Sequence, residues 1–307
     1  MSKKTKKKII LLFGPTASGK SRLAVDIAKE FNGEIVNADS MQVYKEVKVL
    51  SARPNEKSVK HHLYGFVSVK ENFSVGSWYE LAVKKIKDIN KKGKPALVVG
   101  GTGLYFKVLI DGLVKIPEVP KIDYSYLNPI GKWMMQNHYG KRYPKIFEGI
   151  NRNDIQRVSR AISVYDATGI TLSEWQKRKN KKYFNPSEFL KICLNPPKLE
   201  LEKRMKKRFL DMLKNGAIEE TKKYIQSGLS SHTLHTSNSI IGLKEIGLFL
   251  DKKISVKELK EKVLIKTRQY AKRQRTWQRG QMQDWKGFVD VNYLDLLKKV
   301  LSYLSKT

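Results

Sequence analysis

Residues 14–21 read GPTASGKS, a glycine followed by four residues and then Gly-Lys-Ser. An apolar run precedes this segment at residues 9–13, and apolar residues recur at helical spacing through residues 22–31. Between a strand and a helix, this motif is a phosphate-binding loop. Its backbone N–H groups surround phosphate oxygens, Lys20 reaches the terminal phosphates and the Ser21 hydroxyl can bind Mg²⁺. The segment predicts binding of a di- or triphosphate.

Asp39 follows a second predicted strand at residues 34–38. A carboxylate in this position can accept a proton from a nucleophile or help to hold Mg²⁺. Aspartate is also a common N-cap of a following helix. The position of Asp39 alone leaves both interpretations open.

A third predicted strand, residues 96–100, ends in glycines and is followed by Thr102. P-loop ATPases often have an apolar strand that ends in an aspartate, which holds Mg²⁺. The run Val-Leu-Ile-Asp at 108–111 mimics such a strand, but it continues a predicted helix from Leu104. We therefore expect glycines at this strand end to allow close backbone approach, with the Thr102 hydroxyl toward the cleft.

Two basic patterns accompany these loops. Arg204 and Arg208 are four residues apart after a fourth predicted strand, so they can reach the phosphate cleft. Residues 268–279 form a cationic stripe at helical spacing, with two aromatic residues on another face: Arg268, Lys272, Arg275 and Arg279, with Tyr270 and Trp277. This pattern suits RNA phosphates and bases. A solvated helix face is the alternative, but the segment contains no acidic residues, which favours phosphate contact.

The elements that must position these residues are four short apolar strands at residues 8–13, 34–38, 96–100 and 189–194. Helical patterns separate them, which predicts an α/β fold with a doubly wound parallel sheet of the P-loop type. In such sheets, functional loops lie beyond the carboxyl ends of the strands. The loops at 14–21, 39–42 and 101–105 should therefore converge.

The pattern changes between about residues 111 and 184, where breaks and then a helical stretch at 154–167 appear. After residue 197 the chain is mostly helical. We predict a P-loop α/β core with a helical C-terminal region, formed by residues 1–111 and 185–307. Residues 112–184 are predicted to form a helical insertion into this core rather than an independent fold.

Lysine and arginine number 61 against 29 aspartate and glutamate, a net charge of +32. This excess indicates a polyanionic partner or a general lysine bias. The single cysteine, Cys193, lies in an apolar run and is expected to be a packed thiol. The histidine pairs at 61–62 and at 232 and 235 lack metal-binding patterns. No signal peptide or membrane span is evident, so a cytoplasmic location is expected.

Taken in order, eight segments resemble the tRNA dimethylallyltransferase family, also called isopentenyl-tRNA or IPP transferases. The segments are GPTASGKS (14–21), NADSMQVYK (37–45), ARP (52–54), VVGGTGLYFKVLIDGL (98–113), NRNDIQRVSRAISVYDATG (151–169), EKRMKKRFLDML (202–213), IGLKEI (241–246) and TRQYAKRQRTWQRG (267–280). They span most of the chain, and their combination is far more specific than the phosphate loop alone. The chain departs from the family pattern at residues 46–52 and between 119 and 149.

The resemblance implies transfer of a dimethylallyl group from dimethylallyl diphosphate to N6 of the adenosine 3′ of the tRNA anticodon. The phosphate loop would then hold an allylic diphosphate rather than ATP, with Mg²⁺ as cofactor. The expected catalytic residues are Asp39, as general base, and Thr102. The expected partner is the tRNA anticodon stem-loop. The protein is expected to be a monomer that does not associate with a membrane.

The expected diphosphate site comprises Gly14, Pro15, Thr16, Ala17, Ser18, Gly19, Lys20 and Ser21, with Arg204 and Arg208, and Ser21 as the Mg²⁺ ligand. The expected tRNA contacts are Asp39, Ser40, Met41, Gln42, Thr102, Gln156, Arg157, Val158, Ser159, Arg160, Lys272, Arg273, Arg275 and Trp277. A P-loop kinase for a nucleoside or other small molecule is the alternative enzyme and would turn over ATP without RNA. A non-catalytic RNA-binding protein is a third possibility, against which the intact phosphate loop and Asp39 argue.

Overall fold

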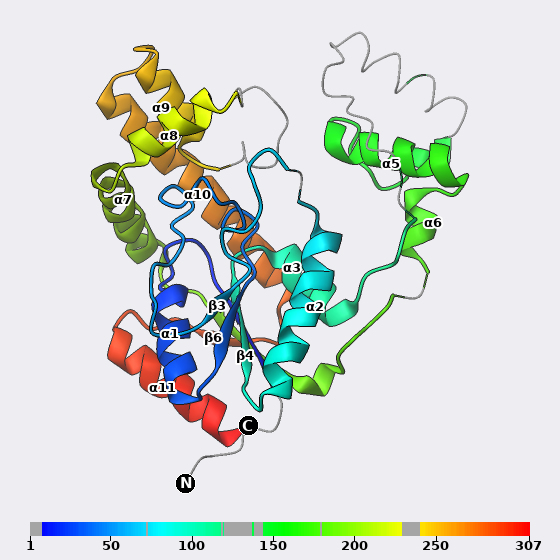
Figure 1. The fold of residues 1–307 in the computed structure, drawn as a ribbon, viewed down its shortest axis with the longest axis horizontal. Helices are drawn as coiled ribbons and strands as arrows, with labels where there is room; N and C mark the ends of the chain where they lie inside the picture. Colours follow the sequence, from blue (N-terminus) through cyan, green and yellow to red (C-terminus); the bar gives the residue numbers. More distant parts are fainter. Residues whose placement is uncertain are drawn as a thin grey trace. The chain divides into compact units, whose positions relative to one another are not determined.

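The computed structural model describes residues 8–71, 73–117, 119, 137, 144–178, 180–228 and 240–307. The chain divides into two compact units (Figure 1). The first combines Met1–Ile110 with Phe184–Thr307, and the second is Asp111–Tyr183. Among the described helices, none combines the length and the apolar character needed to cross a bilayer.

The first unit is built on a six-stranded parallel sheet with the order β3-β2-β4-β1-β5-β6. The strands are β1 (Ile9–Phe13), β2 (Glu34–Asn37), β3 (His61–His62), β4 (Ala96–Gly100), β5 (Phe189–Leu194) and β6 (Lys286–Phe288). All five residues of β1 are buried, which is typical of a parallel strand covered on both faces. The predicted α/β class and its parallel sheet are confirmed, whereas the short edge strands β3 and β6 were not predicted.

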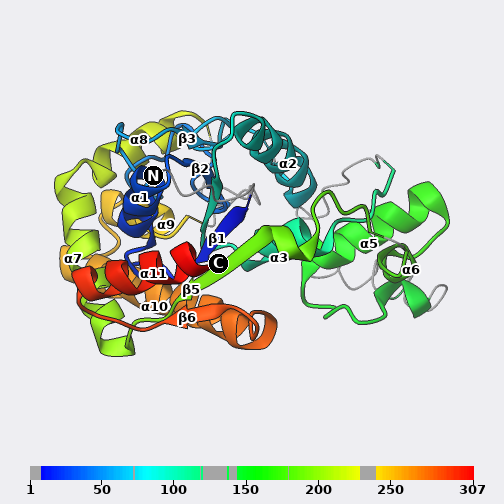
Figure 2. The same cartoon turned by 90° about the horizontal axis from the view of Figure 1, so that it is seen from below.

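Helices α1 (Lys20–Glu30) and α11 (Tyr293–Lys306) cover one face of the sheet and lie side by side (Figure 2). In α11, Leu296, Val300 and Leu304 recur every four residues, so they form one apolar stripe. This stripe packs into the same core as Leu23 and Ile27 of α1. The apolar faces of both helices therefore hold them against the sheet.

Helices α2 (Val75–Lys91) and α3 (Gly103–Asp111) lie on the other side of the sheet (Figure 1). The Trp78 indole N–H of α2 donates to the Asn37 carbonyl of β2 at 2.8 Å. Phe13 and Phe106 meet edge to face at 5.7 Å between ring centroids. These contacts fix the strand ends from which the site loops depart.

The C-terminal helices are α7 (Lys198–Lys214), α8 (Ala217–Gln226), α9 (Leu243–Leu250) and α10 (Val256–Gln281). A separate apolar core joins them to the chain around residues 41–50. The 26-residue helix α10 begins with a capping box between Ser255 and Glu258 and packs on α7 and α9. A short 3₁₀ turn, η3 (Pro186–Glu188), leads into β5.

The second unit contains η2 (Pro144–Phe147), α5 (Ile155–Thr168) and α6 (Leu172–Gln176). Helix α5 is capped by the Asp154 side chain and ends at Gly169, whose φ of 67° is typical of a helix C-terminus. Its buried face packs on η2 through a small core: Ile146, Phe147, Val158, Ala161 and Ile162. This unit thus has an apolar core of its own.

Candidate functional site

The loop between β1 and α1 is stabilised by hydrogen bonds to one of its own backbone carbonyls. Ser18 N–H donates to the Pro15 carbonyl at 3.2 Å, and Lys20 Nζ reaches the same carbonyl at 3.3 Å. Ala17 and Gly19 have φ angles of 63° and 90°. Such left-handed positions turn backbone N–H groups into a concavity that suits an anion, and the N-terminus of α1 adds a positive field.

Two arginines of α7 contact this loop in different ways. Arg208 Nη1 donates to Thr16 Oγ1 at 2.9 Å. Arg204 Nη1 donates to the Ser18 carbonyl at 3.4 Å, and its Nε is paired with Glu200 at 2.6 Å. Arg208 lines a cavity beside the loop, whereas Arg204 is not among the residues that line it. The two predicted phosphate arginines are therefore both at the loop, but of the two only Arg208 lines this cavity.

The loop is electrostatically prepared for an anion. Burial lowers the pKa of Lys20 to about 8, with the carboxylate of Asp39 opposing this effect and the guanidinium of Arg208 adding to it. Burial also lowers the pKa of Arg208, again opposed by Asp39. Two cations thus share one carboxylate, which leaves an uncompensated positive charge next to the phosphate loop.

Asp39 combines a local structural role with an open oxygen. Its own N–H donates to Asn37 Oδ1 at 2.8 Å, and Met41 N–H donates to Asp39 Oδ1 at 3.0 Å. Among the described residues, no hydrogen bond reaches Asp39 Oδ2, and the side chain lines the cavity. One oxygen therefore stabilises a turn, while the other can accept a proton.

Thr102 connects the loop after β4 to the loop that carries Asp39. Ser40 N–H donates to Thr102 Oγ1 at 2.9 Å, and Thr102 N–H donates to the Ala38 carbonyl at 3.2 Å. A Cβ on Gly100 would lie 2.0 Å from the Ala38 carbonyl oxygen. The glycines at this strand end thus permit the close approach of the two loops.

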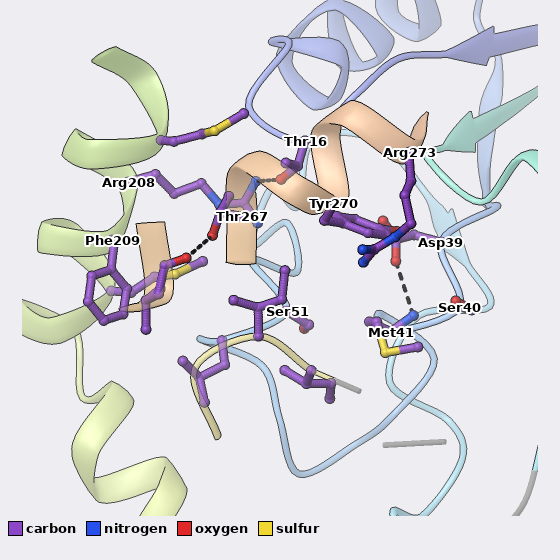
Figure 3. A pocket seen from close by; sticks show the side chains of 16 residues that line it. Thr16, Asp39, Ser40, Met41, Ser51, Arg208, Phe209, Thr267, Tyr270 and Arg273 are labelled. Atoms are coloured by element: carbon purple, nitrogen blue, oxygen red, sulfur yellow. Dashed lines mark hydrogen bonds between the residues drawn. The ribbon is translucent and has the colours of Figure 1, made fainter. Parts of the chain in front are cut away.

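These loops border a cavity of about 180 Å³ (Figure 3). Figure 3 shows Arg208 pointing to Thr16, while Tyr270 and Arg273 of α10 lie beside Asp39. The polar lining includes Thr16, Asp39, Arg208, Tyr270 and Arg273. Apolar side chains form most of the remaining wall: Met41, Met205, Phe209, Met212, Ile240 and Val263. The cavity therefore joins a cationic phosphate loop, a carboxylate and an apolar surface.

Tyr270 is a cavity residue that sequence reasoning placed only among the aromatics of the basic segment. Burial raises its pKa, and the negative charge of Asp39 acts in the same direction. The Tyr270 hydroxyl therefore stays protonated at neutral pH and remains a hydrogen-bond donor. Arg273 lies over the Tyr270 ring at 5.7 Å from its centroid.

The predicted basic stripe lies on α10. Lys272 and Arg273 are exposed and Arg275 is half-buried, and none of the three forms an ion pair among the described residues. Arg268 differs, because its Nε is paired with Glu202 of α7 at 3.4 Å. The sequence segment contains no acidic residue, so this partner could not be expected from the segment alone.

Two other predicted tRNA contacts, Trp277 and Gln42, contact neighbouring loops of the protein. A Cβ on Gly103 would lie 2.2 Å from Nε1 of Trp277, so this indole packs against the loop after β4. The side-chain amide of Gln42 donates to the Ser51 and Ala52 carbonyls at 2.9 and 3.1 Å. Gln42 therefore shapes the loop after Asp39.

Five further predicted tRNA contacts lie on α5 of the second unit. Arg157 and Arg160 are exposed, and Arg157 is paired with Asp154 at 3.2 Å. Val158 is fully buried in the core of that unit, and the Ser159 carbonyl accepts the Ser163 hydroxyl at 2.9 Å. The side chain of Gln156 lies outside the described residues.

The described residues contain no cluster of three or more His, Cys, Asp or Glu side chains that could hold a metal. His62 is hydrogen-bonded to Glu34 at 2.7 Å, while His232 and His235 lie outside the described part of the chain. The Ser21 hydroxyl is exposed at the start of α1. Mg²⁺ at phosphate sites binds the phosphates together with a few protein oxygens, one of which, in P-loop proteins, is the Ser or Thr hydroxyl of the loop. The residues at this loop fit that mode.

One residue of the site gave no motif signal. Gln274 is buried on α10, accepts a hydrogen bond from Thr16 N–H at 2.8 Å and donates to the Gly101 carbonyl at 2.9 Å. Helical spacing places it on the same face as the buried residues Val263 and Ala271. A glutamine on an otherwise packed face requires hydrogen-bond partners, and this is the signal that could have identified it.

Comparisons with known proteins agree with this geometry. A family model described as IPP transferase matches residues 42–281, and one described as isopentenyl transferase matches residues 7–76. The tRNA dimethylallyltransferase of Pelagibacter ubique is 47% identical over 285 residues, which cover 91% of this chain and 90% of that protein. That of Parvibaculum lavamentivorans is 39% identical, covering 96% and 95%.

Solved structures give the same result. The full-length tRNA isopentenylpyrophosphate transferase of Bacillus halodurans has a TM-score of 0.70 at 29% identity and covers 98% of this chain and 96% of its own. A eukaryotic dimethylallyltransferase, captured acting on tRNA, has a TM-score of 0.78 at 28% identity and covers 97% and 78%.

Proposed function

Because this chain belongs to the IPP transferase family, whose curated relatives are tRNA dimethylallyltransferases, we propose that it prenylates an adenosine of tRNA. The transferred group is dimethylallyl, the donor is dimethylallyl diphosphate and the acceptor is N6 of the adenosine 3′ of the anticodon. The observation that carries the proposal is the cavity that joins Thr16 and Arg208 to Asp39. A kinase is not favoured, because β4 ends in glycines rather than in a Mg²⁺-binding carboxylate.

The donor diphosphate is proposed to bind the amides of residues 14–21 together with Lys20 and Arg208. Ser18 Oγ supports this assignment, because it is buried without a hydrogen-bond partner among the described residues. Such an orphan hydroxyl can donate to a phosphate oxygen. Arg204 is proposed to support the loop through the Ser18 carbonyl. The apolar side chains Met205 and Phe209 border the cavity and suit the alkyl part of the donor.

Mg²⁺ is proposed to bind through the Ser21 hydroxyl and the phosphates. When bound, it neutralises negative charge that develops on the leaving diphosphate. Lys20 and Arg208 supply the same stabilisation from the protein, as preorganised cations in a partly enclosed site. The allylic C–O bond breaks more easily because these charges are already in place.

The acceptor adenine must leave its stack to enter the cavity, which costs a few kcal/mol and least in a loop where bases are already unpaired. Asp39 Oδ2 is proposed to accept the N6 proton as the new N6–carbon bond forms and diphosphate departs. General-base catalysis of this kind contributes roughly 10² to 10⁴ in rate. Thr102 holds the turn after Asp39 in place through Ser40.

The tRNA backbone is proposed to bind Lys272, Arg273 and Arg275 on α10, which are exposed or half-buried and form no ion pair with the acidic residues that the structure describes. Arg157 and Arg160 of the second unit are further candidates. We propose a monomer as the active form, because the first unit already contains every residue assigned to the donor site.

The test is incubation of the full chain with labelled dimethylallyl diphosphate, Mg²⁺ and tRNA, followed by nuclease digestion and identification of the modified nucleoside. N6-dimethylallyladenosine at the anticodon-adjacent position supports the proposal. A tRNA with guanosine at that position is the matched control and should stay unlabelled. ATP turnover without RNA would indicate a kinase instead, and tRNA binding without transfer would indicate a non-catalytic RNA-binding protein.

A further inference from the structure

Gln274 of α10 hydrogen-bonds to both loops of the site. Its Oε1 accepts from Thr16 N–H at 2.8 Å, and its Nε2 donates to the Gly101 carbonyl at 2.9 Å. The side chain is only 5% exposed. Both hydrogen bonds are therefore formed away from bulk water, where each is stronger and more costly to lose.

The two partners belong to different functional loops. Thr16 lies in the phosphate loop and also accepts the hydrogen bond from Arg208. Gly101 directly precedes Thr102, whose hydroxyl accepts from Ser40 N–H beside Asp39. Gln274 thus connects the group that would hold the donor to the group that would orient the acceptor.

The chemistry of the bridge requires an amide. One end must accept a hydrogen bond from a backbone N–H and the other must donate to a backbone carbonyl, which a glutamine side chain does with a fixed geometry. The loop after β4 leaves room for this amide only because residue 101 is glycine: a Cβ on Gly101 would lie 2.2 Å from Nε2 of Gln274. Glycine at 101 and glutamine at 274 are therefore complementary.

We propose that Gln274 is a positioning residue for the prenyl transfer, a role that rests on the proposed function. It sets the distance between the phosphate loop and the Thr102 loop, so that diphosphate and Asp39 are held in the geometry that the transfer needs. It touches no substrate itself. Without it, the Thr16 N–H and the Gly101 carbonyl lose their partners, and each loop can settle independently of the other.

The experiment compares Gln274→Met and Gln274→Glu with a matched control, Gln278→Met. Gln278 lies one turn further along α10, is also buried, and its Oε1 has no partner among the described residues. Single-turnover prenylation, tRNA binding and inorganic pyrophosphate binding are measured for each full-length protein. Misplacement by about 1 Å costs on the order of 10²-fold in rate. Gln274→Met should therefore slow transfer roughly tenfold to a hundredfold and weaken pyrophosphate binding, with parental tRNA affinity.

Gln274→Glu gives a signature that a purely structural role would not. A glutamate keeps the acceptor for Thr16 N–H, but its ionised form cannot donate to the Gly101 carbonyl. When protonated, the carboxylic acid can donate again. The rate of the variant divided by the parental rate at the same pH should therefore rise as the pH falls. Should Gln274→Met not fold, this ratio decides the question.

Parental transfer rates and pyrophosphate affinity in Gln274→Met, or an equal loss in Gln278→Met, would overturn the proposal. So would a Gln274→Glu ratio that does not change with pH. Failure of the proposed function is recognised separately, because the parental protein would then form no prenylated nucleoside. Pyrophosphate binding still tests the bridge in that case, since it requires neither the acceptor nor the transfer step.

Discussion

Arg208 Nη1 donates to Thr16 Oγ1 at 2.9 Å, although the two residues are 192 positions apart in the sequence. This hydrogen bond brings a cation of α7 to the phosphate loop of β1–α1. Arg204, one turn earlier on the same helix, is instead paired with Glu200. The two arginines therefore have different positions: Arg208 lines the cavity, whereas Arg204 supports the phosphate loop through the Ser18 carbonyl.

Arg208→Met should therefore impair use of the donor. The variant removes a preorganised positive charge that opposes the charge developing on the leaving diphosphate, and loss of one such group typically costs about 10² to 10³ in kcat. The checks are single-turnover kinetics with varied donor, and tRNA binding, which should be unchanged. Lys207→Met, an exposed neighbour on α7, is the control. Equal losses in both variants would assign the effect to general charge rather than to Arg208.

Donor use should also depend on pH through Lys20, whose pKa burial lowers to about 8. The ammonium form is the one that attracts diphosphate, so kcat/KM for the donor should be level from neutral pH to about pH 8 and fall above it, since this parameter reports the free enzyme. Lys20→Arg stays charged throughout this range. Its residual activity should lack the decline, and an unchanged decline would assign the titration to another group.

The basic stripe should govern tRNA affinity. Lys272→Ala with Arg275→Ala removes two phosphate contacts, so binding should weaken and the salt slope should flatten by roughly two counterion units. Lys84→Ala with Lys91→Ala, two exposed lysines of α2, removes the same charge elsewhere. Filter binding over a range of salt concentrations distinguishes the two pairs. An identical change in both would mean that only net charge matters.

The sequence predicted the parts of the fold that depend on local patterns. Strands β1, β2, β4 and β5 are apolar runs, and the phosphate loop is a single segment whose spacing carries its chemistry. Strand β3, His61–His62, has two half-buried histidines, and β6 begins with two exposed residues. These edge strands form because a neighbouring strand supplies their hydrogen bonds, so no local sequence pattern predicts them.

The same distinction holds for the site. Asp39 and Thr102 could be identified because each follows a recognisable strand. Gln274 could not, because its partners Thr16 and Gly101 are 258 and 173 positions away in the sequence. The different roles of Arg204 and Arg208 depend on two features. Glu200 pairs with Arg204 within α7, whereas the cavity that Arg208 lines is formed where α7 meets α10 and the loops of the site.

In the proposed reaction, Asp39 accepts the N6 proton while the phosphate loop holds the donor. Asp39→Asn tests this role with little change of shape, because asparagine can still accept the Met41 N–H through Oδ1, while an uncharged NH₂ group that cannot take up a proton replaces the open oxygen.

The measurement is the single-turnover rate of prenylation for Asp39→Asn, with tRNA affinity and melting temperature recorded alongside. We predict a rate lowered by roughly tenfold to a thousandfold, with parental affinity and melting temperature. A parental rate would contradict the assignment of Asp39 as the base, and a lowered melting temperature with intact chemistry would reduce its role to the turn.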